Sequence, residues 1–466
     1  MPSERKAKQR IAVVGSGMAG LVTAYLLHQD PKERYEVTVF ESGASFSLDS
    51  ASVSVLNEAR EMVDRIDVPM RAFAEGYYKN LIRMYRYIGV RFKAQRFIYA
   101  FENHAATESE KDSARKCYFI HSSNNHVLPP IRPEGMSLFS WLVEVVYVAV
   151  CYLWWSFCCH MVPPQPATRG HECESLEEYT RRICLPSYFL NSYLLPLMSS
   201  VATCSHAALL QAPARDLTEY KRQTAGGNHY TVSGVHEVQS KLEIGFSVRF
   251  SATVSKVEVA GPERVKVTWK DVDGGVHSEI FAHAVLAVAP EVVAKLFQPL
   301  EKWMKQIPTT TVRSLVRGDG ITLSDIKKPE KNYMPNGSRT VQTIHFRTST
   351  KTGETESTHV HPSGAMVTTC PFINTLSTRD VLSSGQFQRA LRTPRSRRII
   401  NTIFNGPREP QNPDEKPVPW RNGDDNVWLV GGWCWDGMVL LEGCVVSAMR
   451  VASALDVAVP WSDRKP

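Results

Sequence analysis

The stretch IAVVGSGMAG, residues 11–20, decides the fold of this chain. Its first four residues are a short apolar run rich in β-branched side chains, which is typical of a buried strand. Gly15, Gly17 and Gly20 follow in the spacing G-x-G-x-x-G, and the apolar run LVTAYLLHQD after them predicts a helix. The order of strand, glycines and helix therefore predicts the start of a Rossmann-like βαβ unit.

The residues that follow complete this pattern. YEVTVFES reads as a second strand that leads into Glu41, about 20 residues past the glycines, where a ribose-binding carboxylate belongs. In such a unit Gly15 permits the tight turn, Gly17 lets the backbone approach a pyrophosphate, and Gly20 lets the helix lie close to the sheet. The helix N-terminus faces the phosphates. We therefore predict a dinucleotide site made of Gly15, Gly17, Met18, Ala19, Gly20 and Glu41.

Two later parts of the chain read as pieces of the same domain. The middle part ends in HAVLAVAP, a short apolar run of the kind found in parallel strands buried on both faces. Near the C-terminus NVWLVGG reads as a strand that runs into glycines, and EGCVVSAMRVASAL reads as a helix of small residues. The predicted class is α/β, with a discontinuous Rossmann-like domain and a mixed α+β substrate domain. The predicted segments are 9–56, 225–298 and 425–458 for the first domain, and 57–224 and 299–424 for the second.

These three blocks resemble the flavin-containing amine oxidase superfamily, which includes phytoene desaturases, polyene isomerases and protoporphyrinogen oxidase. The nearest pattern is a fungal and bacterial subgroup of predicted FAD/NAD-binding oxidoreductases, similar to IDVPMRAFAEGYYKNLIRMYRYIGV at Ile66–Val90. The resemblance spans most of the chain. It implies FAD as the cofactor, and it implies that Val254 in SATVSKV lies near the adenine.

Two positions depart from the family pattern. The family usually has an arginine and a glycine pair just after the ribose acid, whereas this chain has Ser45 at the arginine and Ser47 and Leu48 at the glycine pair. Neutralisation of the cofactor phosphates is then expected from backbone amides or from elsewhere. The acid usually found near the ribityl chain is also absent, because Trp433 follows Gly432.

The stretch GGWCWDGMVLLEG, residues 431–443, is interpreted as the wall of the flavin pocket. Gly432 allows the backbone to approach the cofactor closely, and Trp433 supplies flat apolar surface. Glu442 and Gly443 begin a helix, whose N-terminal amides and dipole can stabilise negative charge on a reduced flavin. We therefore predict that all four residues contribute to cofactor binding.

Several side chains keep two interpretations. Both tryptophans of this stretch, including Trp435, either face the flavin or pack a domain interface. Asp436 is either a helix cap or a polar contact to the ring, and Cys434 is either a covalent flavin link or a small buried hydrophobe. His229 and Tyr230 follow a glycine pair and are candidates for lining the substrate cavity.

The segment MSLFSWLVEVVYVAVCYLWWSFCCHMV, residues 136–162, carries one charged residue, Glu144. It is long enough to span a bilayer. A single crossing is excluded if both ends of the chain build one domain, because they would lie in different compartments. Three arrangements remain: a monotopic helix in one leaflet, a buried helix that roofs an apolar cavity, and a hairpin completed by LPSYFLNSYLLPLMSSVAT.

Composition limits the partners. The formal net charge of +7 is mild for 466 residues and does not indicate nucleic acid. The basic stretch RALRTPRSRR, residues 389–398, is either a solvated face or a contact for anionic lipid or a phosphorylated substrate. The ten cysteines form no C-x-x-C pair and the polar N-terminus is no signal peptide, so we expect the cytoplasmic side, with membrane association if the helix is monotopic. His359 and His361 lack further ligands at motif spacing, and no metal site is predicted.

Three functional hypotheses follow from these patterns. The first is an FAD-dependent oxidoreductase that removes hydride from a lipophilic small molecule by oxidation or desaturation. The second is a redox-neutral isomerase that uses reduced flavin, as some polyene-handling relatives do. The third is a non-catalytic lipid carrier, as the escort proteins of prenylated GTPases show for this fold. No catalytic base can be named from the sequence, so the catalytic residues stay unassigned.

Overall fold

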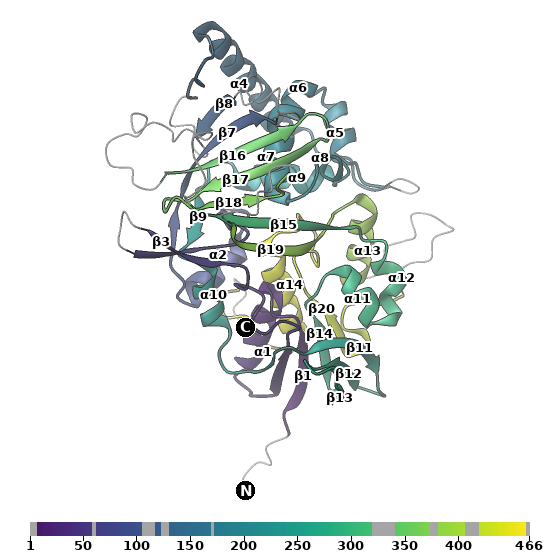
Figure 1. The fold of residues 1–466 in the computed structure, drawn as a ribbon. Helices are drawn as coiled ribbons and strands as arrows, with labels where there is room; N and C mark the ends of the chain where they lie inside the picture. Colours follow the sequence, from purple (N-terminus) through teal and green to yellow (C-terminus); the bar gives the residue numbers. More distant parts are fainter. Residues whose placement is uncertain are drawn as a thin grey trace.

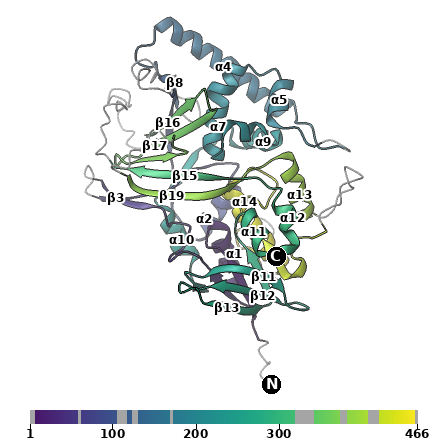
Figure 2. The same ribbon diagram turned by 45° about the vertical axis from the view of Figure 1, so that its right-hand side comes forward.

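The computed structural model describes residues 7–57, 62–104, 117–122, 130–168, 172–318, 341–372, 381–405 and 419–462. Two layers of structure meet in the middle of the molecule (Figure 1). A parallel sheet with its helices forms the lower part, and a larger mixed sheet with a group of helices forms the upper part, as a second view also shows (Figure 2).

The lower part is built on a five-stranded sheet in which every neighbouring pair is parallel. Its strands come from three distant parts of the chain. In sheet order they are β10 (Ser247–Arg249), β2 (Tyr35–Phe40), β1 (Gln9–Val14), β14 (His283–Leu286) and β20 (Val427–Leu429). The predicted α/β class with a discontinuous Rossmann-like domain is therefore confirmed. The segment boundaries stay a prediction.

Helices cover one face of this sheet, and an antiparallel sheet together with further helices covers the other. Helix α1 (Met18–His28) is apolar on almost all sides, because it lies between the sheet and α14 (Leu441–Ala454). The other elements of the lower part are α10 (Val235–Leu242), α11 (Pro290–Leu296), α12 (Glu301–Met304), and an antiparallel sheet of β11 (Thr253–Val259), β12 (Val265–Lys270) and β13 (Val276–Phe281).

The upper part is built on a seven-stranded mixed sheet. Its order is β19 (Val381–Ala390), β15 (Thr309–Arg317), β18 (Met366–Thr369), β17 (Glu354–Val360), β16 (Val341–Ser349), β7 (Arg96–Asn103) and β8 (Cys117–Ser122). Only β16 and β7 pair in parallel within it, and they lie on opposite sides of the apolar segment in the sequence. Small pieces join the two parts, namely β3 (Val53–Asn57) with β4 (Met62–Ile66), and β5 (Phe73–Ala74), β9 (His229–Val232) and β6 (Phe92–Ala94).

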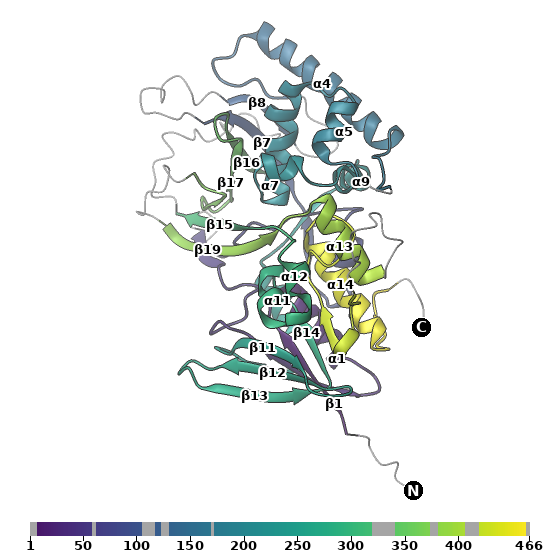
Figure 3. The same ribbon diagram turned by 90° about the vertical axis from the view of Figure 1, so that its right-hand side faces the viewer.

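Helices cover one face of the large sheet (Figure 3). They are α4 (Leu138–Met161), α5 (Leu176–Arg182), α6 (Ser187–Phe189), α7 (Leu195–Ala202), α8 (His206–Leu210) and α9 (Ala214–Thr224). Two more helices, α2 (Lys79–Tyr87) and α13 (Pro394–Asn405), lie where the two parts meet.

Helix α4 runs along the outer edge of the upper part, far from the parallel sheet (Figure 3). Among the described residues it is the one helix long and apolar enough to cross a membrane. One side of α4 packs on the protein through Trp155 and neighbouring cysteines, and the other side leaves Leu142, Val146 and Leu153 exposed at 47%, 62% and 67%. Because this apolar face is open, the expectation of a buried roof is wrong.

The fold also argues against a membrane hairpin and against a single crossing. Residues 185–203 form the short helices α6 and α7 with a π-helical turn between them, which is not a second span. The strands β7 and β16, before and after α4, pair in one sheet, so α4 cannot cross a bilayer alone. Its charged residue, Glu144, accepts hydrogen bonds from the hydroxyls of Tyr188 and Tyr193 and so lies on the protein side.

A buried carboxylate ties α14 to the base of the upper part. Glu442, in the first turn of α14, is 2% exposed. It accepts hydrogen bonds from the amide of Asn80 at 3.0 Å, from Asn80 Nδ2 at 2.7 Å and from the amide of Leu81 at 3.0 Å. These donors belong to the first turn of α2, where the helix dipole favours a negative charge. The contact fixes the C-terminal helix against a segment from the first hundred residues.

The first prediction concerns this contact. Replacing Glu442 by alanine leaves one buried and two partly buried donors without an acceptor, so we expect the free energy of unfolding to fall by about 2 kcal/mol. The measurement is chemical unfolding followed by circular dichroism, with the exposed Glu36→Ala as the matched control. A Glu442→Ala protein as stable as the Glu36→Ala protein would contradict the assigned role.

Candidate functional site

The glycine turn between β1 and α1 is packed to the limit of what backbone atoms allow. Gly15 has φ +100°, and a Cβ there would lie 2.8 Å from the carbonyl oxygen of Ala287. A Cβ at Gly20 would lie 2.0 Å from the carbonyl oxygen of Gly15, so α1 touches the turn that precedes it. A Cβ at Gly17 meets no heavy atom nearer than Ser47 Oγ at 3.9 Å. Gly15 and Gly20 therefore serve packing, whereas Gly17 leaves open space.

Glu41 lies at the end of β2 beside this turn and is 6% exposed. Its Oε2 accepts hydrogen bonds from the amide of Ser16 at 3.1 Å and from the Ser16 hydroxyl. Its Oε1 accepts from the amide of Gly43 at 2.8 Å. Oε1 also accepts from the Ser42 hydroxyl at 3.2 Å, so each oxygen accepts two hydrogen bonds and the carboxylate holds the glycine turn in place.

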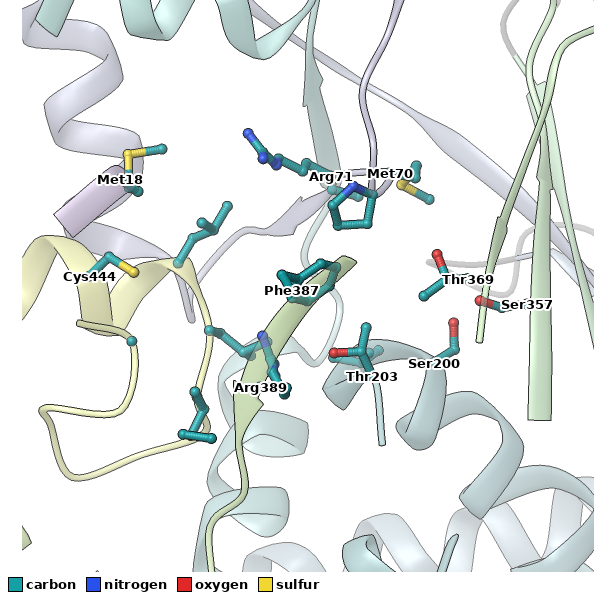
Figure 4. Close-up of a pocket in the computed structure, with 18 of the residues that line it drawn as sticks. Met18, Met70, Arg71, Ser200, Thr203, Ser357, Thr369, Phe387, Arg389 and Cys444 are labelled. Carbon is teal, nitrogen blue, oxygen red and sulfur yellow. The ribbon is translucent and has the colours of Figure 1, made fainter. Parts of the chain in front are cut away.

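A cavity of about 420 Å³ begins at this turn. Gly17, Met18 and Ala19 line one end of it, and the N-cap residue of α1 provides no side-chain hydrogen bond to the free amides there. Gly432 and Trp433 also line the wall. The cavity then extends between the C-terminal loop and the large sheet, as the close-up shows with Met18 and Cys444 on one side and Ser357 and Thr369 on the other (Figure 4).

The remaining predicted residues lie around this cavity without lining it. Gly15, Gly20 and Glu41 support the turn from behind. Gly443 packs on Trp435, where an added Cβ would lie 2.4 Å from the indole ring, and the Glu442 side chain points to α2. Val254 is buried in β11 within the core beneath the parallel sheet. The structure therefore brings five of the eleven predicted residues to the cavity wall: Gly17, Met18, Ala19, Gly432 and Trp433.

The structure shows what the side chains of the loop that follows β20 contact. Trp433 both lines the cavity and packs inward, because its Nε1 donates a hydrogen bond to the carbonyl oxygen of Val288 at 3.1 Å. Trp435 packs against Tyr77 with ring centroids 5.8 Å apart. Asp436 is neither a cap nor a cavity group, since it pairs with Arg397. Cys434 is fully buried behind the loop.

Of the two candidates that follow the glycine pair, His229 and Tyr230, only one lines the cavity. His229 lines it, whereas Tyr230 points away and stacks on Phe73 with ring centroids 5.9 Å apart. His359 also lines it, and its Nε2 hydrogen-bonds Gln342 Oε1 at 2.6 Å. His361 lies outside, against Ser363. Among the described residues no group of three or more potential metal ligands converges here or elsewhere.

The charges on the cavity wall are all positive. Among the described lining residues no aspartate or glutamate occurs, and the ionised groups are Arg71 and Arg389. Burial lowers the pKa of His229 to about 4 and that of His359 to about 3, and it raises the pKa of Cys444 to about 11. Each of these three groups is therefore neutral at pH 7. An otherwise uncharged cavity with two guanidinium groups is a site for anions.

Arg71 supplies the positive charge that the sequence lacks after Glu41. Its Nη2 donates a hydrogen bond to the carbonyl oxygen of Leu48 at 2.8 Å, and its Nη1 is buried without a hydrogen-bond partner. Leu48 follows Ser47, whose amide donates to Ser16 Oγ within the glycine turn. Although Arg71 lies in the stretch Ile66–Val90 quoted above, sequence reasoning missed it, because only the fold brings it beside the turn.

The basic stretch 389–398 is not a uniformly solvated face. Arg392 and Arg397 are each 7% exposed and lie near the buried Asp216. One Arg392 nitrogen, Nη2, donates to three carbonyl oxygens of the C-terminal loop, those of Trp433 at 3.1 Å, Trp435 at 2.8 Å and Gly437 at 3.1 Å. The interpretation as a solvated face is wrong for these two arginines, because Arg392 binds backbone carbonyls and Arg397 pairs with Asp216 and Asp436. Arg395 of the same stretch is exposed.

These features define a Rossmann-like domain of the nucleotide-binding type that opens into a second, mostly apolar chamber. Residues 13–88 match the family model of the NAD(P)-binding Rossmann-like domain. The fold is similar to the crystal structure of an oxidoreductase from Methanosarcina mazei, with a TM-score of 0.55 over 95% of this chain and 100% of that chain. At 12% identity this likeness shows the fold alone. A search of curated protein sequences finds no match.

The second prediction tests the support of the cavity loop. Replacing Arg392 by methionine removes three hydrogen bonds and one of the two arginines beside the buried Asp216, so we expect a loss of about 3 kcal/mol in stability. Amide hydrogen exchange should also accelerate across residues 433–437. Arg395→Met, on the exposed side of α13, is the matched control. Unchanged exchange in this loop would show that Arg392 does not hold it.

Proposed function

We propose that the protein is an FAD-dependent oxidoreductase of the amine oxidase superfamily that oxidises or desaturates a lipophilic small molecule. One observation carries the proposal. The amino end of α1, which in Rossmann-like domains binds the cofactor phosphates, and a chamber walled by apolar side chains are two ends of one cavity. The resemblance of the three sequence blocks to flavin enzymes selects FAD among nucleotide cofactors.

The residues around the turn fit a dinucleotide diphosphate. The space beside Gly17 is open to the cavity, the first amides of α1 have no side-chain cap, and Arg71 keeps one buried nitrogen without a partner. Amides and a guanidinium that need acceptors are the groups that bind phosphate oxygens. Glu41 would hold the adenosine ribose by exchanging the Ser42 hydroxyl at Oε1 for a ribose hydroxyl. Gly432 and Trp433 would hold the part of the cofactor deeper in the cavity.

FAD, when bound, supplies a two-electron acceptor that takes hydride from a C–H bond. The chain itself positions the substrate and excludes water. Apolar side chains from the large sheet and from α7 form the chamber wall: Phe97, Leu197, Val201, Ile344, Phe346 and Phe387. His229 and His359 are neutral there, so they offer lone pairs or N–H groups without adding charge. The chamber therefore favours an apolar reacting group.

The third prediction is the absorption spectrum of the purified protein. We expect bound flavin at a 1:1 ratio and its loss in Gly17→Val, because the valine side chain enters the open space at the helix terminus. That space is free of protein atoms, so thermal unfolding of the unliganded variant should match that of the wild type. A colourless wild-type protein that carries lipid would overturn the proposal and favour the lipid carrier.

We also propose that the exposed face of α4 rests in one leaflet of a membrane. The face is continuous, and its apolar side chains are among the most exposed of the molecule: Leu138, Phe139, Leu142, Val143, Val146, Val150, Leu153, Trp154, Phe157 and Met161. The sequestration of Glu144 against two tyrosine hydroxyls leaves this face without charge. Because β7 and β16, before and after α4, pair in one sheet, the helix would lie in the interface rather than across it.

The fourth prediction follows from this geometry. Lysine at Leu142, Val146 and Leu153 together should prevent sedimentation with phosphatidylcholine vesicles, while wild-type sedimentation should resist high salt because an apolar contact is not screened. The flavin content should stay unchanged, since α4 does not line the cavity.

The matched control for this test is a second triple lysine variant at exposed valines far from α4. Val259 and Val276 lie in the β11–β13 sheet and Val272 in the turn between β12 and β13, with exposures of 49%, 66% and 79%. This control protein should sediment with vesicles as the wild type does. Equal binding of the α4 variant and the control would contradict the assignment of this face.

A further inference from the structure

Arg389 has no use in the cofactor site described above. It lies on β19, the edge strand of the large sheet, and its side chain reaches the cavity between Phe387 and the end of α7 (Figure 4). No hydrogen bond or ion pair of its guanidinium occurs among the described residues. The groups closest to it in charge effect are the thiols of Cys204, Cys370 and Cys444 and the phenol of Tyr78.

None of these neighbours carries a negative charge at pH 7. Burial raises the pKa of Cys204, Cys370 and Cys444 to about 11 each, and it raises the pKa of Tyr78 further. The guanidinium itself stays protonated in any protein environment. Arg389 is only partly buried by the protein, so its guanidinium is accessible from the cavity. An anionic ligand would give it the countercharge that the described residues do not supply.

A second unpartnered group faces the same point. Thr203, which ends α7 in the left-handed conformation with φ 49°, has a buried hydroxyl without any hydrogen-bond partner. Figure 4 shows this hydroxyl on the side of Arg389. A guanidinium fork with a nearby hydroxyl donor fits the two oxygens of a carboxylate. The surrounding wall is apolar, so the rest of the ligand has to be apolar as well.

We propose that Arg389 and Thr203 bind the carboxylate of an amphiphilic substrate, so that the substrate class is a lipophilic carboxylic acid such as a fatty acid. The proposal rests on the function proposed above, because it assigns the diphosphate to the glycine turn and Arg71 rather than to Arg389. Arg71 adjoins the glycine turn through Leu48, whereas Arg389 adjoins α7 and the large sheet. The two guanidinium groups thus serve two anions, one from the cofactor and one from the substrate.

The fifth prediction compares decanoate with decanamide, which has the same shape and no charge. Calorimetric titration of the wild-type protein should give about tenfold or tighter binding of decanoate, the ratio expected for a charge-assisted hydrogen bond. Arg389→Gln should remove this preference and leave decanamide binding unchanged. Arg389→Lys should keep part of it, and Thr203→Val should weaken decanoate alone. The flavin content of all three variants should equal that of the wild type.

Each contrary result has a distinct meaning. Equal binding of the two probes by a yellow wild-type protein would overturn the carboxylate site and leave the proposed function intact. Loss of flavin in Arg389→Gln, with the preference for decanoate retained, would overturn it by assigning Arg389 to the cofactor. A colourless protein that still prefers decanoate through Arg389 would support the carboxylate site and contradict the flavin enzyme. Thermal unfolding of Arg389→Gln shows that the variant is folded, and we expect no loss of stability because the residue has no partner.

Discussion

The close approach of α1 to its own turn is the constraint on which the rest of the structure depends. A Cβ at Gly20 would lie 2.0 Å from the carbonyl oxygen of Gly15, so this distance exists only because both positions are glycine. It lets α1 lie between the parallel sheet and α14, with its N-terminus at the cavity. The turn also touches Ala287 from the middle of the chain. Three distant segments therefore have to fold together before the cofactor end of the cavity exists.

The cavity wall contains neutral titratable groups and permanently charged ones. Its histidines and its thiol are neutral at pH 7 because burial shifts their pKa values away from neutrality. Its charge resides in Arg71 and Arg389, which cannot lose their protons. By contrast, Arg392 and Arg397 have partners inside the fold and stabilise the loop. The sequence alone does not distinguish these two kinds of arginine. Those paired with acidic side chains stabilise the fold, and those that form no ion pair among the described residues face the cavity.

The sequence predicted the parts of this structure that depend on local pattern. The glycine spacing and the short apolar strands predicted the discontinuous Rossmann-like domain, because turn chemistry and burial on both faces leave clear local signals. The roles of Arg71 and Arg389 could not be read in this way, since they depend on contacts between residues far apart in the chain. The sequence leaves three arrangements open for α4, because a uniformly apolar helix has no pattern that shows which side is covered.

Helix α9 contacts both the cavity that contains the proposed carboxylate site and the helix that we propose to rest in a membrane. Helix α9 contacts α4 through Lys221, whose Nζ donates to the hydroxyl of Tyr152. The same helix lines the cavity through Tyr220, so one layer of helices separates α4 from the cavity. Moving a carboxylate from water into an apolar chamber has a prohibitive cost in free energy unless the chamber contains a charged partner. Arg389 removes that penalty for an acid, whereas a neutral lipid of equal length would leave the guanidinium unpaired. Selection would then come from the cost of an unmatched buried charge, which discriminates more strongly than the fit of an apolar chain.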